Sequence, residues 1–396
     1  MKKTLFIHIG RPKAGSSAIQ HFLWMNKALL MEQGCYYPEA GQRHRASHGL
    51  SSTLLPKFSG ENKFANLSAK SLYRQLIEEI DEQETADRVV ISTENFYFVD
   101  PKKVKQFLKE KFNVKIICYV RNQADVLMSS YVQELKEDKL QDDNIANYIQ
   151  DSTRLRLIDY HANLERWARV FGRENIIVRP YEQGQFEGSD IFRDISHVIG
   201  VHVSDEFAIP SLKVNPSPAS DVLELIKLLN VMSDSRFVVT QLIRPLLDAS
   251  EYLPKEDRYD SKRLLTTAQH ESINRQFSES NEKVAREFLG RDDGMLFYET
   301  CKPEDAVEIT KEFTLERFVA VAAKLFLSQQ EDIATMRTRL DVQRDKIEAL
   351  SDLLAQHSGV ATEALENIES RSVKDADEPT EEVASGFGSR FRRWFS

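Results

Sequence analysis

The sequence predicts an α/β fold: a doubly wound parallel β-sheet with helices on both faces, followed by an α-helical C-terminal extension and a short coiled coil. Short runs dense in Val and Ile alternate with segments of helical periodicity. Strands of this composition, separated by helices, are typical of a parallel sheet that is buried on both faces. The length of 396 residues provides for two or three folding units at about 150 residues each.

The expected strands and helices alternate along the N-terminal half of the chain. The first strand is expected at 4–9 and ends at Gly10, and the first helix follows over 16–30. Further strands are expected at 88–92, 114–120 and 175–181, each after a helical segment, at 68–82, 101–112 and 154–171 respectively. Connections long enough to hold a helix favour parallel pairing of the strands.

The C-terminal half is expected to be helical. Helices are predicted at 219–232 and 262–289, and a longer one from 303 onward. The longer helix carries a heptad pattern in which six of eight seam positions are apolar: Ile333, Leu340, Ile347, Leu354, Met336, Gln343, Leu350 and His357. The pattern favours a coiled coil over 331–357 that joins two copies of the chain. The alternative is one amphipathic helix packed on its own domain.

Residues 358–386 lack this periodicity. Residues 358–382 hold eight acidic side chains against Arg371 and Lys374, which is typical of a linker. The chain then ends with aromatic residues interleaved with arginines, from Phe387 to Phe395. Such a tail suits contact with a membrane surface or a protein groove, and a frayed terminus is the alternative.

Charge and composition exclude several classes of protein. The net charge is −9, which is unsuited to general binding of nucleic acid, and no apolar run approaches the roughly 18 residues of a membrane span. The apolar N-terminal stretch is too short for a signal peptide and runs into Arg11 and Lys13. Three widely spaced cysteines indicate neither a disulfide framework nor a metal cluster, and they fit a cytoplasmic protein. Two locally basic segments, 1–57 and 101–121, favour a small anionic ligand.

The loop RPKAGSS, residues 11–17, joins the first expected strand to the first helix. Backbone N–H groups at a helix N-terminus form a natural anion site. Gly15 permits close approach of a phosphate, Ser16 and Ser17 offer hydroxyls, and Lys13 supplies a positive charge. The order differs from the phosphate-binding motif GxxxxGK[ST], because Lys13 precedes Gly15. The loop is P-loop-like in its strand–loop–helix arrangement, and an ordinary turn is the alternative.

A second element, YVRNQADVLMSSY, follows the expected strand at 114–120. Arg121 leaves the strand and Ser129 lies eight residues later on a helix, so both can reach one further phosphate group. Together the two elements resemble the nucleotide-binding motifs of sulfotransferases that use 3′-phosphoadenosine 5′-phosphosulfate (PAPS). The resemblance implies that Arg11, Pro12, Lys13, Ala14, Gly15, Ser16 and Ser17 bind the 5′-phosphosulfate, and that Arg121 and Ser129 bind the 3′-phosphate.

A third segment, NIIVRPYEQGQ, is similar to the family's later strand and its Tyr-Glu turn. On this resemblance Tyr181 contacts the adenine, and a turn tyrosine packed on the core is the alternative. The Arg-Lys-Gly segment that cytosolic members place near their C-terminus is not found, and Lys213 is a weak substitute for it. The resemblance extends in order over residues 4–200.

The resemblance implies transfer of a sulfuryl group to a hydroxyl by in-line displacement, without a metal ion. Lys13 would stabilise the leaving oxygen. The base is expected to be Glu94, at the end of a strand, where open parallel sheets place their sites, or His48. Two further candidates, His44 and Glu39, lie in the loop after the first helix, and His44 and His48 would share a helix face.

The sequence therefore predicts four parts, and the resemblance implies a PAPS-dependent sulfotransferase of the bacterial carbohydrate type. These are an α/β domain over 1–210, a helical part over 211–302 completing the acceptor side, the long helix over 303–357, and the linker and tail. The acceptor is expected to be a glycan or another hydroxyl compound, and the location cytoplasmic, at the inner face of the membrane if the tail binds there. A P-loop kinase and a non-catalytic coiled-coil adaptor are the alternatives.

Overall fold

The computed structural model describes residues 2–55, 68–108, 110–137, 140, 144–210, 220–232, 243, 245–247, 264–299 and 315–357. The expectations for Lys213, for the linker and for the aromatic tail lie outside these residues. The chain divides into two compact units, Met1–Ala322 and Ala323–Ser396, and each is described by itself. No helix in the described part is long and apolar enough to cross a membrane.

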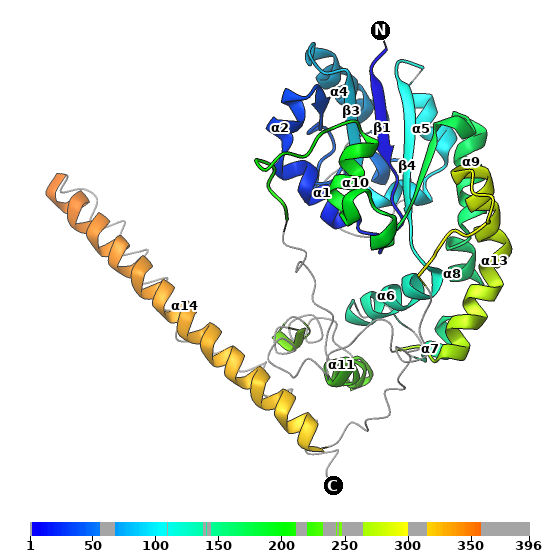
Figure 1. The fold of residues 1–396 in the computed structure, drawn as a ribbon. Coiled ribbons are helices and arrows are strands. Elements are labelled where there is room, and N and C mark those ends of the chain that lie inside the picture. Colours follow the sequence, from blue (N-terminus) through cyan, green and yellow to red (C-terminus); the bar gives the residue numbers. More distant parts are fainter. Residues whose placement is uncertain are drawn as a thin grey trace. The chain divides into compact units, whose positions relative to one another are not determined.

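The first unit is built on a five-stranded parallel sheet with the strand order β2-β3-β1-β4-β5 (Figure 1). Its strands are β1 Thr4–His8, β2 Cys35–Tyr36, β3 Arg88–Ser92, β4 Asn113–Val120 and β5 Ile176–Pro180. The predicted doubly wound α/β fold is confirmed. Only β2 was not expected, because two residues are too short to show a period.

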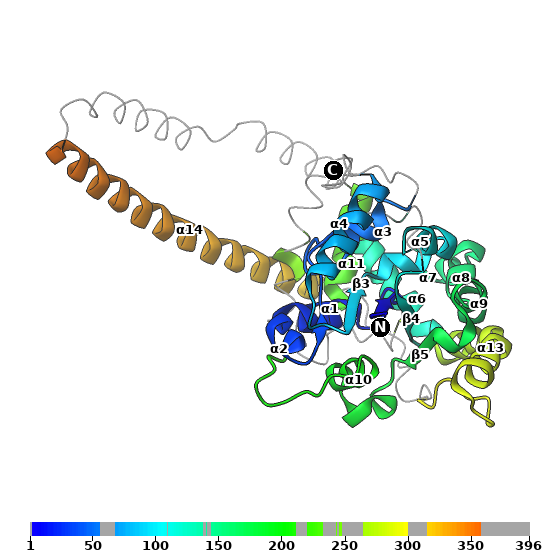
Figure 2. The ribbon, with the colours of Figure 1, turned by 90° about the horizontal axis from the view of Figure 1, so that it is seen from above.

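The strands alternate between two cores, one on each face of the sheet. In β1, Leu5 and Ile7 enter the first core and Phe6 enters the second. Helices α4 (Ala69–Glu82), α5 (Pro101–Leu108) and α9 (Tyr160–Phe171) supply side chains to the first core, and α1 (Ser16–Met25) and α10 (Ile191–Val198) supply the second. Figure 2 shows these two sets of helices on opposite sides of the sheet.

The remaining elements complete this unit and begin the next. They are α2 Lys27–Glu32, α3 His48–Ser52, α6 Gln123–Lys136, α7 Ile145–Tyr148, α8 Ser152–Leu157, α11 Ser220–Met232, α13 Thr267–Leu289 and α14 Leu315–His357. Short 3₁₀ turns lie at Glu94–Phe98 (η1), Arg173–Asn175, Gln183–Gln185 and Glu187–Ser189.

Three expected helices differ from those observed. The helix expected over 16–30 is interrupted at Asn26, whose amide donates to the carbonyl oxygens of Phe22 and Ala208 at 2.8 and 2.9 Å. The helix expected over 154–171 is divided in two, because Asp159 caps α9 by accepting from the backbone of Ala162. Helix α13 begins later than position 262, at a capping box formed by Thr266 and Gln269.

The strand order determines where a ligand can bind. The chain leaves β1 toward β2 and β3 on one side and returns to β4 on the other, so β1 lies between β3 and β4. In open parallel sheets the crevice at such a reversal, outside the carboxyl ends of the strands, is the usual binding site. The connections that follow β1, β3 and β4 therefore meet at one edge of the sheet.

A buried carboxylate joins β4 and β5 to α10. Asp194 is fully buried and accepts hydrogen bonds from the Tyr119 hydroxyl at 2.6 Å and from Arg179 Nε at 3.0 Å. It also accepts from the backbone N–H of Glu187 at 2.8 Å. Since every partner is a donor, Asp194 fixes α10 against the sheet.

We predict that Asp194→Ala lowers the free energy of unfolding by about 3–5 kcal/mol, because it leaves the partly buried cation of Arg179 and the buried hydroxyl of Tyr119 without their acceptor. The matched control is Asp190→Ala, which removes only the N-cap of the same helix and should cost about 1 kcal/mol. Urea denaturation followed by circular dichroism measures both. Equal losses in the two variants would contradict this role for Asp194.

Candidate functional site

The loop after β1 is held in a strongly curved conformation. Gly10, Lys13 and Gly15 all have positive φ, at 49°, 73° and 79°, and Gly15 is the N-cap of α1. A left-handed conformation at a non-glycine residue such as Lys13 costs about 1–3 kcal/mol and is found mainly at functional sites. A side chain at Gly15 would lie 2.5 Å from atoms of Tyr181 and Ile191, so only glycine fits there.

Two polar atoms of the loop, Arg11 Nε and Ser16 Oγ, are buried and have no hydrogen-bond partner in the structure. The same is true of Nε2 of His8, at the end of β1. Arg11 and Ser16 belong to the predicted anion-binding segment, whereas Ser17 is exposed. Buried polar groups are nearly always paired, so unpaired donors at a helix N-terminus point to a bound anion. The donor set, a guanidinium and a hydroxyl beside backbone N–H groups, fits a phosphate or sulfate group.

Arg121 connects the end of β4 to this loop. Its Nη1 donates to the backbone oxygen of Lys13 at 3.3 Å, and its Nε donates to Asp125 at 3.4 Å. The guanidinium also lies over the Tyr181 ring, 5.6 Å from the ring centre. The structure therefore brings together the first loop, Arg121 and Tyr181, which are distant in the sequence and were each predicted to contact a nucleotide.

Ser129 lies on α6, as expected, on the helix face that points toward the loop. Asp125, Ser129 and Gln133 are spaced four residues apart on this helix and so share one face. Asp125 pairs with Arg121, and Gln133 accepts a hydrogen bond from Lys13 Nζ at 3.2 Å. Sequence reasoning missed Gln133, because the loop that it contacts is 120 residues away.

The amine of Lys13 is partly removed from water. Burial lowers the pKa of Lys13, the charges of Glu137 and Glu94 act to raise it, and those of Arg11 and Arg121 act to lower it further. Burial, and then the charge of Lys13, also lower the pKa of Lys136. Several cations therefore lie near Lys13 and repel one another. A bound anion would reduce this repulsion.

Glu94 lies opposite the loop, at the start of η1 directly after β3. Its Oε2 accepts a hydrogen bond from the buried amide of Gln20 on α1 at 2.7 Å. Its Cα lies 3.3 Å from where a side chain on Gly10 would be. The charge of Glu94 acts to raise the pKa values of Lys13 and His8, so Glu94 influences both the loop and the end of β1.

His48 is the second candidate base that the structure places here. Its Nδ1 is hydrogen-bonded to Thr93 Oγ1 at 2.8 Å, next to Glu94 in the sequence. Burial lowers the pKa of His48, and the charge of Glu94 acts in the opposite direction. A neutral imidazole beside a carboxylate is suited to accept a proton. The carboxyl end of β3 thus presents two groups capable of base catalysis.

The other two candidate bases lie elsewhere. The prediction that His44 and His48 share a helix face is wrong, because α3 begins at His48, whereas His44 is exposed in a turn with a φ of 50°. Glu39 is 78% exposed and forms a surface ion pair with Lys27 at 3.0 Å. Neither residue has a described contact with Glu94 or with the loop.

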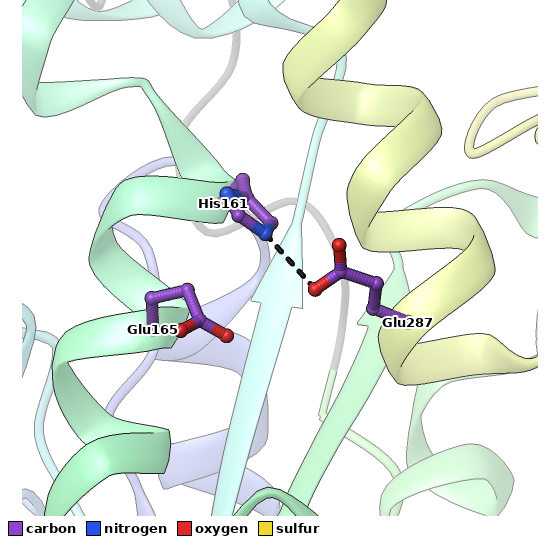
Figure 3. Close-up of side chains that lie close together, drawn as sticks. All are labelled: His161, Glu165 and Glu287. Carbon is purple, nitrogen blue, oxygen red and sulfur yellow. Dashed lines mark hydrogen bonds and ion pairs between the residues drawn. The ribbon is translucent and has the colours of Figure 1, made fainter.

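A separate cluster joins α9 to α13 (Figure 3). His161, Glu165 and Glu287 have ligand atoms within 4.8 Å of one another, and His161 Nε2 lies 3.1 Å from Glu287. Arg173 pairs with both carboxylates. Its guanidinium already supplies the positive charge that two carboxylates attract, so we interpret the cluster as an ion-pair network between the two helices.

Comparison with known proteins identifies the domain. Residues 3–286 match the sequence model described as Sulfotransferase domain. An uncharacterised protein of Archaeoglobus fulgidus is 25% identical over 214 residues, which are 51% of this chain and 54% of that protein, so the match spans about half of the relative's length.

Two solved structures are also similar. A sulfotransferase from Alicyclobacillus acidocaldarius is 19% identical, with a TM-score of 0.38 over 62% of this chain and 96% of that one. A mouse sulfotransferase complexed with PAP is 13% identical, with a TM-score of 0.34 over 74% and 87% of the two chains. These scores are too low to carry an argument.

The buried histidine beneath the loop gives a prediction for stability. Burial lowers the pKa of His8 from 6.5 to about 4, and its Nδ1 is hydrogen-bonded to Ser92 Oγ at 2.8 Å. Between these pH values the unfolded chain binds a proton at His8 that the folded chain does not. The contribution of neutral His8 to the free energy of unfolding is therefore complete above pH 6.5, and it is lost as the pH falls toward 4.

We predict that the loss of stability between pH 7.5 and pH 5 is smaller in His8→Gln than in the unaltered protein, by about 2 kcal/mol. Urea denaturation at the two pH values measures it. His202→Gln, a change on an exposed residue, serves as the control. If His8→Gln keeps the full pH dependence, His8 is not the buried neutral group described here.

Proposed function

This chain belongs to the sulfotransferase domain family, because residues 3–286 match the sequence model of that family, and we propose that it transfers a sulfuryl group from PAPS to a hydroxyl group. The single observation that carries this proposal is the convergence of the loop at 11–17, Arg121 and Tyr181 at one sheet edge. A nucleotide with phosphates at both its 5′ and 3′ positions requires two separate anion sites, and this edge offers two.

The 5′-phosphosulfate is assigned to the loop after β1. The unpaired donors Arg11 Nε and Ser16 Oγ would find acceptors in its oxygens, and the N-terminus of α1 adds backbone N–H groups. Pro12, Ala14 and Gly15 contribute through the backbone, and Ser17 lies in the exposed first turn of the helix. The 3′-phosphate is assigned to Arg121, which precedes α6 and contacts the same loop, and to Ser129 on α6.

Lys13 is assigned to the leaving group. As the S–O bond breaks, negative charge grows on the bridging oxygen of the nucleotide, and a nearby ammonium stabilises it. Lys13 Nζ is held by Gln133 Oε1, which is a neutral acceptor. Partial burial strengthens the interaction between this ammonium and a developing anion.

Glu94 is assigned as the base, and His48 is the alternative. The hydrogen bond from Gln20 fixes one oxygen of Glu94 and leaves the other to accept the acceptor's proton. A positioned base such as Glu94 suits an alcohol as acceptor, for example a sugar hydroxyl of a glycan. A phenol with a pKa of about 10 ionises readily, whereas an alcohol needs a positioned base. The resemblance of the motifs to bacterial carbohydrate-type members supports the same choice.

Nucleotide binding is the first test. We predict that adenosine 3′,5′-bisphosphate raises the melting temperature without magnesium, and that Arg121→Gln reduces its affinity at least tenfold. Affinity for adenosine 5′-phosphate should fall less, because both nucleotides use the loop that Arg121 holds but only the bisphosphate carries a 3′-phosphate. Arg166→Gln is the control, because Arg166 donates to Val99 on a different element. Magnesium-dependent stabilisation by ATP instead would indicate a kinase, and no response to either nucleotide would favour a non-catalytic adaptor.

The role of Lys13 predicts a kinetic effect. Removing one donor that stabilises a developing oxyanion costs about 2.7–4 kcal/mol, or roughly 10²–10³ in kcat, so we expect Lys13→Ala to lose that much turnover. Transfer of label from PAPS to a panel of glycans, lipids and small alcohols measures it and identifies the acceptor. Turnover should be unaffected in Lys27→Ala, which removes an ion pair with Glu39 and a hydrogen bond to Gln42 away from the loop. Near-normal turnover in Lys13→Ala would refute the assignment.

The base is tested by the pH dependence of the rate. General base catalysis contributes about 10²–10⁴-fold, so Glu94→Gln should lose this factor together with the fall in rate at low pH, which reports protonation of the base. His48→Ala should keep that low-pH limb and lose less than tenfold, and Glu39→Ala serves as the surface control. The reverse pattern would make His48 the base.

A further inference from the structure

The helix α14 carries an exposed apolar seam that the proposed reaction does not use. Within the second unit, residues 323–357 of this helix are continuous (Figure 1). The side chains of Met336, Leu340 and Leu350 are 63%, 63% and 59% exposed. Ile333 and Ile347 are exposed as well. With Gln343 these residues occupy alternating three- and four-residue steps along one face, the spacing of a coiled-coil seam.

The seam continues at one of its two positions before Ile333. Phe326 lies seven residues before Ile333 and is 61% exposed, so one seam position is apolar at Phe326, Ile333, Leu340 and Ile347, whereas the other position of the added heptad is Gln329. Large apolar side chains at this exposure and spacing are typical of a surface that binds another helix.

The charges beside this seam determine what can bind there. Over 336–347 the positions that flank the seam hold Arg337, Arg339, Arg344 and Lys346, and all four are basic, whereas the flanking position one heptad before Arg339 holds Asp332. Acidic residues of the same stretch, Asp341, Asp345 and Glu348, lie away from the seam. Arg344 forms ion pairs with Asp341 and Asp345, at 3.3 and 3.8 Å. The ion pairs described for this helix include none of Arg337, Arg339 or Lys346.

Pairing of the stretch with its own copy leaves most of these basic residues without an acidic partner. In a parallel pair the flanking position of one helix faces the other flanking position of its partner, which sets Arg339 against Arg344 and gives an opposite charge only to Arg337, from Asp332. In an antiparallel pair each kind of flanking position faces itself, so basic residues again meet mostly basic residues. Like charges at these positions oppose association and direct partner choice.

We propose that α14 is a docking helix for a different protein, whose partner segment is an amphipathic helix with an apolar seam flanked by carboxylates. The seam provides the buried contact, and the four basic residues select the partner by charge. Gln343 interrupts the seam and favours a register in which a polar side chain stands opposite it. The narrow seam, two positions in seven, suits a helix rather than a lipid surface.

The test uses the full chain and two designed helical peptides of four heptads, each with leucines along the seam and one glutamine to face Gln343. One peptide carries glutamates at the flanking positions and the other carries lysines. We expect the glutamate peptide to bind at least tenfold more tightly at 50 mM NaCl, by fluorescence anisotropy, and the preference to shrink at 500 mM NaCl because salt screens the flanking charges.

A charge-reversed variant is the matched control. Changing Arg337, Arg339, Arg344 and Lys346 to glutamate should invert the preference toward the lysine peptide, while stabilisation by adenosine 3′,5′-bisphosphate reports that the first unit is intact. Three results would overturn the proposal: equal affinity for the two peptides, binding to anionic vesicles with no binding to either peptide, or sedimentation of the unaltered chain as a dimer that persists at both salt concentrations. The last would restore the homodimer that the heptad pattern predicts.

Discussion

The backbone of the loop after β1 is the constraint on which the candidate site depends. Its left-handed residues are kept in place from outside, because Tyr181 and Ile191 close on Gly15 and Arg121 holds the carbonyl oxygen of Lys13. Those contacts come from the ends of β4 and β5 and from α10. The loop therefore has its shape only when the whole sheet edge is assembled, and the strain at Lys13 is offset by packing elsewhere.

The same edge separates the charges of the site into two groups. Cations lie on the loop and on α6, whereas the carboxylate of Glu94 and the imidazole of His48 lie at the end of β3. In the proposed reaction, an anionic donor would bind on the side of the cations and a neutral acceptor molecule on the side of Glu94 and His48. The buried amide of Gln20 supports this division, since it donates to Glu94 without adding charge.

Most of the sheet could be predicted from the sequence, since runs such as RVVIS and VKIICYV are buried on both faces and need Val and Ile throughout. The anion loop and Arg121 were predictable because their positions follow directly from the ends of the strands. What could not be predicted depends on contacts between distant segments. Asn26 ends α1 through Ala208, and Gln133 holds Lys13, and neither partner is visible in the local pattern. His44 was misplaced because a four-residue spacing indicates a shared face only within a helix.

The central claim is that one anionic nucleotide occupies the edge formed by the loop after β1 and the end of β4. Hydrogen–deuterium exchange with and without adenosine 3′,5′-bisphosphate tests it most directly. We expect the nucleotide to slow exchange of backbone amides in residues 10–18 and 121–126 and to leave those of α9 unchanged. Unchanged exchange in both segments, or protection confined to α9 and α13, would contradict the claim.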